Sequence, residues 1–404
     1  MPLIVQKYGG SSMADLDKIR QVAKQVAAVK RAGYDVAVVV SAMGKTTDQL
    51  LSLAKSLTPE PPRRELDMLL TVGERISMAL LSIAIQEEGF EAVSLTGSQS
   101  GIITNDRHFD ARIIEVRPVR VEDELHQGRV VIVAGFQGVS YKREITTLGR
   151  GGSDTTAVAL AAALGADRCE IYSDVDGVYS ADPNLVRQAR HLPEISYQEM
   201  QEMASAGAKV LNPQAVEFAK QAGIAIYCRA AFTPGRETVV RRGEAREQTG
   251  VKAVVSERKM VRGRLRGAGL VPCFEEVLRA AEKANVVLKE VGVSVPSLEE
   301  WSRGSFVISS ATLPDWPRIR RILLKAGGDR IELDEDVAAV SLIGEGINRD
   351  GRNLLRALEI LREIGSPVLG VATTSFRISL LTKEDRLDQS VQTLHQRFIE
   401  EPSA

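Results

Sequence analysis

Apolar runs alternate with stretches of helical spacing through the amino-terminal part of the chain. Residues 3–8 begin with an apolar run and residues 36–40 are apolar throughout, which predicts two buried strands. Between them apolar residues recur at helical spacing over 19–29, and Gly33 ends that run. Because continuous apolar runs are typical of parallel strands covered on both faces, this stretch predicts a β-α-β unit.

The same alternation continues along the chain. A helix is predicted from about 65 to 87, and strands at 92–95 and 130–134. Strands alternating with helices predict an α/β fold with a mostly parallel sheet between helical layers. Ligands of such sheets bind at the carboxyl ends of the strands. The predicted site loops therefore follow Tyr8, Val40, Ala134 and Tyr172.

The pattern changes after about Pro234. Residues 235–250 are rich in Arg, Glu and Gly, as an exposed connector would be. Beyond them two successive β-α-β-β-α series form an internal repeat in pattern. We expect a catalytic domain at 1–234, a linker at 235–250 and smaller α+β domains at 251–334 and 335–401, whose strands can interleave.

The stretch from Thr147 to Thr156 has the densest candidate chemistry. Its glycines let the backbone come close to a ligand, while Arg150, Ser153 and Asp154 add charge and hydrogen bonds. The apolar run at 157–164 predicts a helix, whose free first N–H groups attract anions. A glycine turn without a ligand is the alternative, and a guanidinium between glycines argues against it.

Polar groups also follow the first two strands. Lys7 beside Gly9 and Gly10 places an ammonium at a glycine turn, as phosphoryl transfer requires. A solvated lysine at a strand end is the alternative. Ser41 and Thr47 offer hydroxyls after the second strand, although Thr47 could instead cap a helix.

Two further candidates are acidic. Glu74 lies in an otherwise apolar helix, where its carboxylate could meet a substrate ammonium, pair with Arg75 or face water. The loop at 173–179 is acidic and follows a strand. It suits contacts to ribose, base or metal-bridged phosphate, or an Asx-rich turn.

Composition excludes several classes of partner. The 52 basic and 53 acidic residues balance, which argues against a polyanion or an anionic membrane. Aromatic residues make up 4% and are not interleaved with basic ones, so no nucleic acid is expected. Three separated cysteines fit reduced thiols in the cytoplasm. The start does not read as a signal peptide, and the longest apolar runs are short of a membrane span.

Known catalytic motifs are missing from the sequence. It contains no P-loop, no G-x-G-x-x-G after the first strand, no G-x-S-x-G and no H-E-x-x-H. The four histidines are scattered, with no pair at ligand spacing.

Taken in order, eight stretches resemble the aspartokinases of the amino acid kinase family. They are residues 5–12, 41–44, 71–77, 95–99, 133–138, 146–157, 171–179 and 207–211. The resemblance implies a three-layer amino acid kinase sandwich that transfers the γ-phosphoryl group of ATP to the β-carboxylate of L-aspartate. The product would be 4-phospho-L-aspartate, the first intermediate toward lysine, threonine and methionine. Mg²⁺ would arrive with ATP, with no direct protein ligand expected.

The resemblance also implies roles for individual residues. Lys7 would hold the transferring phosphoryl group, and Asp154 would organise Lys7, Mg²⁺ or the substrate amino group. The aspartate-binding residues would be Ser41, Thr47, Glu74, Arg150, Gly151, Gly152 and Ser153. The nucleotide-binding residues would be Lys7, Tyr8, Gly9, Gly10, Ser173, Asp174, Tyr179, Asp182 and Lys209. Asn184 stands where the family usually has Arg, which would remove one phosphate or nucleotide contact.

The carboxy-terminal part resembles the family's paired ACT regulatory domains more loosely. It departs from their effector turns and strands at 268–273, 288–293, 349–352 and 372–376. We therefore expect altered or lost inhibition by lysine and threonine. Edge pairing of ACT-like sheets predicts a homodimer or a higher homo-oligomer.

Two alternatives stay open at this point. One is another kinase of carboxylates, acting on glutamate or N-acetylglutamate; the use of Glu74 for an ammonium argues for a free amino acid. The other is a catalytically idle amino-acid sensor, against which Lys7, Arg150 and Asp154 argue together.

Overall fold

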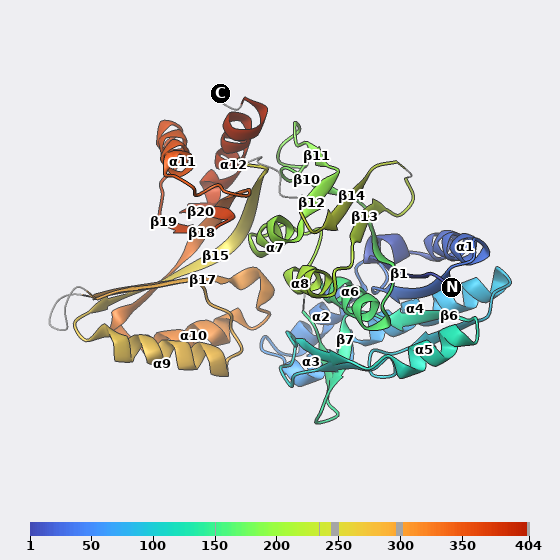
Figure 1. Ribbon diagram of the computed structural model, residues 1–404. Coiled ribbons are helices and arrows are strands. Elements are labelled where there is room, and N and C mark those ends of the chain that lie inside the picture. Colours follow the sequence, from blue (N-terminus) through green and yellow to red (C-terminus); the bar gives the residue numbers. More distant parts are fainter. Residues whose placement is uncertain (150, 234, 244–249, 296–301, 402–404) are drawn as a thin grey trace. The chain divides into compact units, whose positions relative to one another are not determined.

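The computed structural model describes the chain except residues 150, 234, 244–249, 296–301 and 402–404 (Figure 1). Its contacts divide the chain into two compact units. The first unit comprises Met1–Tyr179, His191–Ser205 and Lys209–Glu247. The second unit comprises Ser180–Arg190, Ala206–Ala208 and Gln248–Ala404.

The first unit is built on an eight-stranded sheet in the order β12-β14-β13-β9-β1-β2-β6-β3. Its strands are β1 (Leu3–Tyr8), β2 (Asp35–Val40), β3 (Ala92–Leu95), β6 (Val130–Ala134), β9 (Arg168–Ser173), β12 (Glu194–Ser196), β13 (Ile226–Ala230) and β14 (Glu237–Arg241). All neighbours are parallel except β13 and β14. The central strands are apolar and almost wholly buried, as a strand between two helical layers must be. The predicted α/β fold is confirmed.

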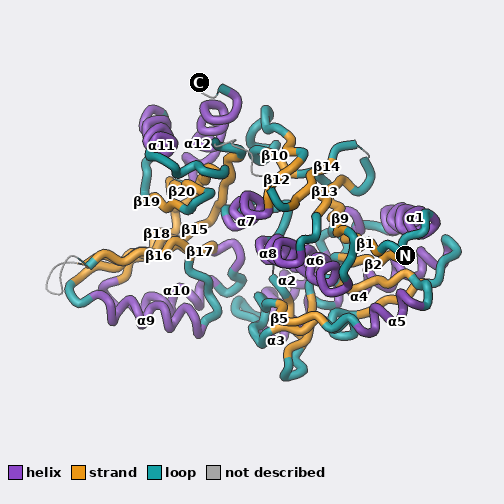
Figure 2. Tube along the Cα trace, in the orientation of Figure 1, coloured by secondary structure: helices purple, strands orange, loops and turns teal. Residues whose placement is uncertain are grey.

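Helices cover both faces of this sheet (Figure 2). On one face α1 (Leu16–Arg31) and α4 (Val72–Glu87) share a core with alternate residues of β2. From the other side α6 (Gly152–Leu164) packs on β1, β2 and β9. The unit also contains α2 (Thr46–Leu57), α3 (Arg63–Leu70), α5 (Val119–His126), α7 (Tyr197–Ser205), α8 (Pro213–Ala222) and the 3-10 turn η1 (Gly10–Met13).

Short strands form two smaller sheets in the first unit. Four of them pair in the order β5-β4-β7-β8, where β4 is Ile102–Thr104, β5 is Ile113–Val116, β7 is Gln137–Ser140 and β8 is Ile145–Thr147. A two-stranded pair joins β10 (Val178–Tyr179) to β11 (His191–Leu192). The four-stranded sheet positions the chain that enters α6, because β8 ends at Thr147.

The helix predicted at 65–87 is divided at Thr71 into α3 and α4. By length and composition alone, Arg63–Glu87 would be long and apolar enough to cross a membrane, contrary to the sequence expectation. Half of its most apolar window is buried inside the protein, however. It also has the carboxylates of Asp67 and Glu74 among its buried side chains, as a core helix beside a polar site does.

The second unit contains one six-stranded antiparallel sheet in the order β16-β17-β15-β18-β20-β19. Its strands are β15 (Ala253–Gly267), β16 (Lys289–Ser294), β17 (Ser302–Ser309), β18 (Ile331–Ile343), β19 (Gly370–Thr373) and β20 (Arg377–Thr382). The long strands β15 and β18 pair along most of their length and serve both halves of the repeat. A bulge between Glu257 and Met260 interrupts them, with Lys259 at a φ of 54°.

Each half of the repeat has its own helices and core. Helices α9 (Leu270–Lys283) and α10 (Trp316–Gly327) enclose one core, and α11 (Arg352–Glu363) and α12 (Leu387–His395) enclose the other (Figure 1). The predicted tandem series of strands and helices is present, as two ACT-like modules require. Ala181 and Val186, from the segment Ser180–Arg190, contribute to the second core.

Candidate active site

A buried ion pair joins the first strand to the glycine-rich loop. Lys7, at the end of β1, is 9% exposed, and its Nζ lies 2.6 Å from Oδ1 of Asp154. Asp154 lies in the first turn of α6 and is 5% exposed. Two charges this well buried require each other, because removing either one leaves the other unpaired away from water. The pair is the charged centre of the candidate site.

Glycine lets the loops after β1 and β2 touch. A Cβ on Gly10 would lie 2.9 Å from the carbonyl oxygen of Ala42, closer than real side chains come. The Gly44 N–H also donates to the Gly10 carbonyl at 3.0 Å. The strand ends that carry Lys7 and Ser41 are therefore held side by side.

Glu74 meets this junction from α4. The N–H of Ala42 donates to Glu74 Oε1 at 3.0 Å, while Oε2 is buried with no partner in the described part of the chain. Gly73 makes the approach possible, because a Cβ there would lie 2.7 Å from that of Ala42. The side chain is 3% exposed, and burial raises its pKa to about 7. The Glu74 side chain is not exposed to water, and among the described residues it forms no ion pair with Arg75. Its carboxylate is therefore placed to bind a cationic ligand.

The start of α6 is shaped by contacts of small residues. Gly151 occupies the N-cap with a φ of 76°, and no side chain caps the helix. A Cβ on Gly135, after β6, would lie 2.8 Å from Ser153 Oγ. Thr155 Oγ1 is buried without a partner. An uncapped helix start with buried hydroxyls is suited to an anion. Arg150, predicted to clamp a carboxylate, lies outside the described residues.

Ser41 and Thr47, which are also predicted to bind the substrate, lie directly after β2 and in the first turn of α2. Ser41 and Thr47 are both partly buried, and Ser41 donates its N–H to the Tyr8 carbonyl at 3.1 Å. The N-cap of α2 is Lys45, with no side-chain cap, so Thr47 is not used as a cap. Its hydroxyl is thereby left for another role. Ser12 Oγ, which the sequence reasoning missed, is also buried without a partner in η1.

The residues predicted to bind nucleotide differ in their exposure and in the hydrogen bonds that they make. Ser173 ends β9 and its hydroxyl accepts from the N–H of Val175 at 3.2 Å, which closes a turn. Asp174 is exposed at the same strand end. Tyr179 donates to Asp176 Oδ1 at 2.6 Å. These side chains outline a polar edge beside β1.

Three more of the residues predicted to bind nucleotide, Tyr8, Lys209 and Asp182, are placed differently in the structure. The ring of Tyr8 is fully buried and stacks on Tyr172 with centroids 4.7 Å apart, so it serves the core. Lys209 is exposed in the first unit. Asp182 belongs to the second unit, where its Oδ1 accepts from the N–H of Asn184 at 2.9 Å. Direct contacts in the first unit join the segments that carry Lys7, Asp154, Ser41 and Glu74, whereas Asp182 lies in the second unit.

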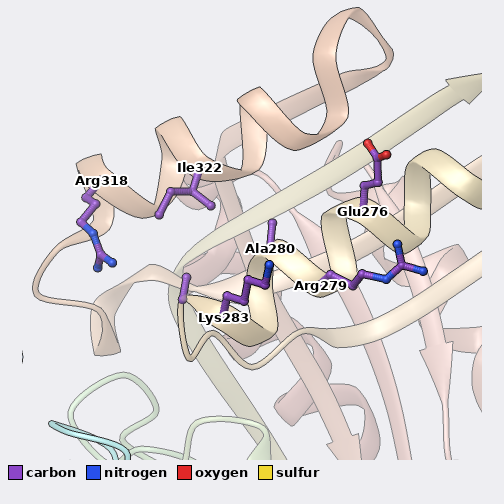
Figure 3. A pocket seen from close by; sticks show the side chains of 7 residues that line it. Glu276, Arg279, Ala280, Lys283, Arg318 and Ile322 are labelled. Carbon is purple, nitrogen blue, oxygen red and sulfur yellow. The ribbon is translucent and has the colours of Figure 1, made fainter.

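A separate groove of about 450 Å³ lies between α9 and α10 of the second unit (Figure 3). Arg279, Lys283 and Arg318 line it together with Ile322. Arg279 pairs with Glu275, and Arg318 pairs with Asp315. The groove contains none of the predicted site residues.

Comparison with known protein families first identifies the class of protein. The model of the Amino acid kinase family matches residues 2–230. That range includes β1 to β13 and the charged centre at Lys7 and Asp154, while β14 of the large sheet lies beyond it.

Relatives then narrow the class. Over 98% of this chain and 96% of theirs, the aspartokinase of Mycolicibacterium smegmatis is 43% identical and that of Corynebacterium efficiens is 45% identical. The fold is similar to that of E. coli aspartokinase III in complex with aspartate and ADP, with a TM-score of 0.85, 24% identity and coverage of 98% and 99% of the two chains. Aspartate kinase from Synechocystis is 34% identical with a TM-score of 0.55, covering 98% of this chain and 68% of that one. The chain belongs to the amino acid kinase family, as one of its aspartokinases.

Proposed function

We propose that the protein transfers the γ-phosphoryl group of ATP to the β-carboxylate of L-aspartate, giving 4-phospho-L-aspartate in the cytoplasm. The observation that carries the substrate assignment is Glu74, whose Oε2 is buried without a partner among the residues that the structure describes. An ammonium group of a free amino acid supplies the missing positive charge and hydrogen bond. N-acetylated substrates lack that group, so they fit this site poorly.

The chemistry follows from charge and alignment. The nucleophile is already a carboxylate, so no strong base is needed, and the barrier comes from bringing anions together. Lys7 neutralises charge on the transferring phosphoryl group, and Asp154 fixes the ammonium of Lys7 at 2.6 Å. At the start of α6 the N–H groups of Gly152 and Asp154 already donate to the carbonyls of Gly149 and Gly151 at 3.1 Å, so the helix start attracts anionic oxygens chiefly through its dipole. Arg150 keeps the role that the sequence gives it, a fork for the α-carboxylate.

Mg²⁺ would arrive bound to ATP, with no direct protein ligand expected, and the Asp154 carboxylate is already paired with Lys7. When bound with ATP it would neutralise phosphate charge. In the second unit, the departures from the family's effector turns support altered or absent inhibition by lysine and threonine.

The test is turnover of Mg-ATP with L-aspartate, trapping the acyl phosphate as a hydroxamate. L-Glutamate, N-acetyl-L-glutamate and succinate serve as competing substrates. We expect turnover with L-aspartate and none with succinate, which keeps both carboxylates but lacks the ammonium. Equal turnover with succinate would show that Glu74 does not bind a substrate ammonium. If none of the four compounds supports ATP turnover, a catalytically idle amino-acid sensor is the remaining interpretation.

A further inference from the structure

Asp67 is a carboxylate inside α3 that the predicted chemistry does not use. It is 0% exposed and has three different donors. Thr147 Oγ1 donates to Oδ1 at 2.5 Å, the N–H of Phe109 donates to the same oxygen at 3.0 Å, and His108 Nδ1 lies 2.6 Å from Oδ2. A buried carboxylate with this many partners fixes the position of all of them, because each would be left unpaired without it.

Two of those partners lead directly to the glycine-rich loop. Thr147 is the last residue of β8, two positions before Gly149. Gly149 has a φ of 70°, and a Cβ there would lie 2.7 Å from Asp110 Oδ1 and 3.4 Å from the Phe109 carbonyl. The chain at 108–110 therefore lies against the loop, and Asp67 holds both segments.

The backbone around the loop is strained on both sides. Phe109 and Phe136 have φ angles of 73° and 66°, which are unusual for bulky residues. A Cβ on Gly152 would lie 3.1 Å from the Phe136 ring, and Leu148 donates its N–H to the Phe136 carbonyl at 2.9 Å. Strain of this kind persists only when surrounding contacts enforce it, and it gathers at functional sites.

Helix geometry relates Asp67 to the proposed ammonium site. Asp67 and Glu74 are seven residues apart in consecutive helices that run from Arg63 to Glu87. Only Thr71 separates the two helices. One helical stretch therefore contacts the Ala42 junction through Glu74 and the glycine-rich loop through Asp67.

We propose that Asp67 is a positioning residue that holds Thr147, Leu148 and Gly149, which lead into the glycine-rich loop, in the geometry that receives the amino-acid substrate. This inference rests on the proposed function for the identity of the substrate. Asp67 acts through Thr147 and Phe109, and the nucleotide side of the site does not depend on it.

The experiment compares D67N, T147V and T147S with the wild type in the full chain. We expect the KM for L-aspartate to rise at least about tenfold in D67N and T147V, with the KM for ATP changed less than about twofold. T147S keeps the hydroxyl and should restore the wild-type KM. D35N is the matched control. It breaks the half-buried ion pair between Asp35 and Lys30 at 2.8 Å, and Asp35 begins β2, at the end of the strand away from the candidate site.

Amide hydrogen exchange of the free protein provides a second measurement that needs no turnover. Peptides that contain Thr147 and Gly152 should exchange faster in D67N and T147V, and unchanged in D35N. If both KM values rise together, or exchange in these peptides does not change, Asp67 has only a structural role and the proposal is wrong. If the wild type does not phosphorylate aspartate, the proposed function fails, and the exchange measurement alone decides whether Asp67 holds the loop.

Discussion

Replacing Glu74 by glutamine should stabilise the protein while removing its substrate binding. Burial raises the pKa of Glu74 from 4.5 to about 7. The ionised carboxylate therefore destabilises the folded state by about 3 kcal/mol at pH 8, at 1.36 kcal/mol per pKa unit. A buried glutamine leaves an amide group without a partner, which costs about 1–2 kcal/mol. The net gain is then about 1–2 kcal/mol, or about 2–8 °C in Tm for a unit of this size.

The pH dependence identifies the cause of this gain. Between pH 4.5 and 7 the folded state holds a proton on Glu74 that the unfolded state has released, so the wild type loses stability as the pH rises through that window. Above about pH 7 the penalty is constant. The Tm advantage of E74Q should therefore be largest at pH 8 and should shrink, or reverse, as the pH falls to 4.5.

The assay is thermal unfolding of both proteins from pH 4.5 to 8, alongside the KM for L-aspartate. The control is E87Q, the same change at an exposed position of the same helix. We expect E74Q to raise the KM for aspartate by about 100-fold or more, because a buried ammonium would lose its charge partner. A Tm difference that does not change with pH, or a loss of stability at pH 8, would refute the reasoning about burial.

Substitutions at Lys7, Gly152 and Ser180 test separate parts of the structure, with K7R and G165A as controls. K7M should lower kcat by about 10³-fold or more by removing the charge that neutralises the phosphoryl group, and K7R should recover part of it; equal kcat values would contradict the role of the 2.6 Å pair with Asp154. G152A should raise the KM for aspartate, since its Cβ would lie 2.7 Å from that of Leu148. G165A, which has open space and a φ of 60°, should lower only the Tm. S180A removes a buried hydroxyl that bonds the His395 ring at 2.8 Å, and should cost about 1–2 kcal/mol in the second unit, measured by urea unfolding.

The sequence predicts the large sheet and its polar edge well, for a physical reason. Central parallel strands are buried on both faces, so they appear as uninterrupted apolar runs such as 36–40, and connecting helices appear between them. Once the strands are known to be parallel, Lys7, Ser41 and Gly135 must share one edge. Motif order then adds Asp154 and Glu74 to that edge.

Other features leave no such pattern in the sequence. Strands β4 and β8 have three residues each, too few to show a period. Asp67 lies within a helix between Leu66 and Met68, where nothing distinguishes a buried carboxylate from an exposed one. The segment Ser180–Arg190 contributes to the second unit through Ala181 and Val186, a contact between residues far apart in the chain. Long-range packing of this kind depends on tertiary contacts, which local residue types do not encode.

Several unfavourable features of the first unit lie on segments that carry the candidate site. Glu74 Oε2, Ser12 Oγ and Thr155 Oγ1 are buried without partners among the described residues, and Phe109 and Phe136 have strained backbones. Each of these features costs stability, and each lies in a loop or helix turn of the candidate site. A bound ligand that supplies an ammonium and anionic oxygens would satisfy the orphaned groups together. The same features that weaken the free protein are then the ones that give the ligand its binding energy, which is why removing Glu74 should raise stability and reduce affinity at once.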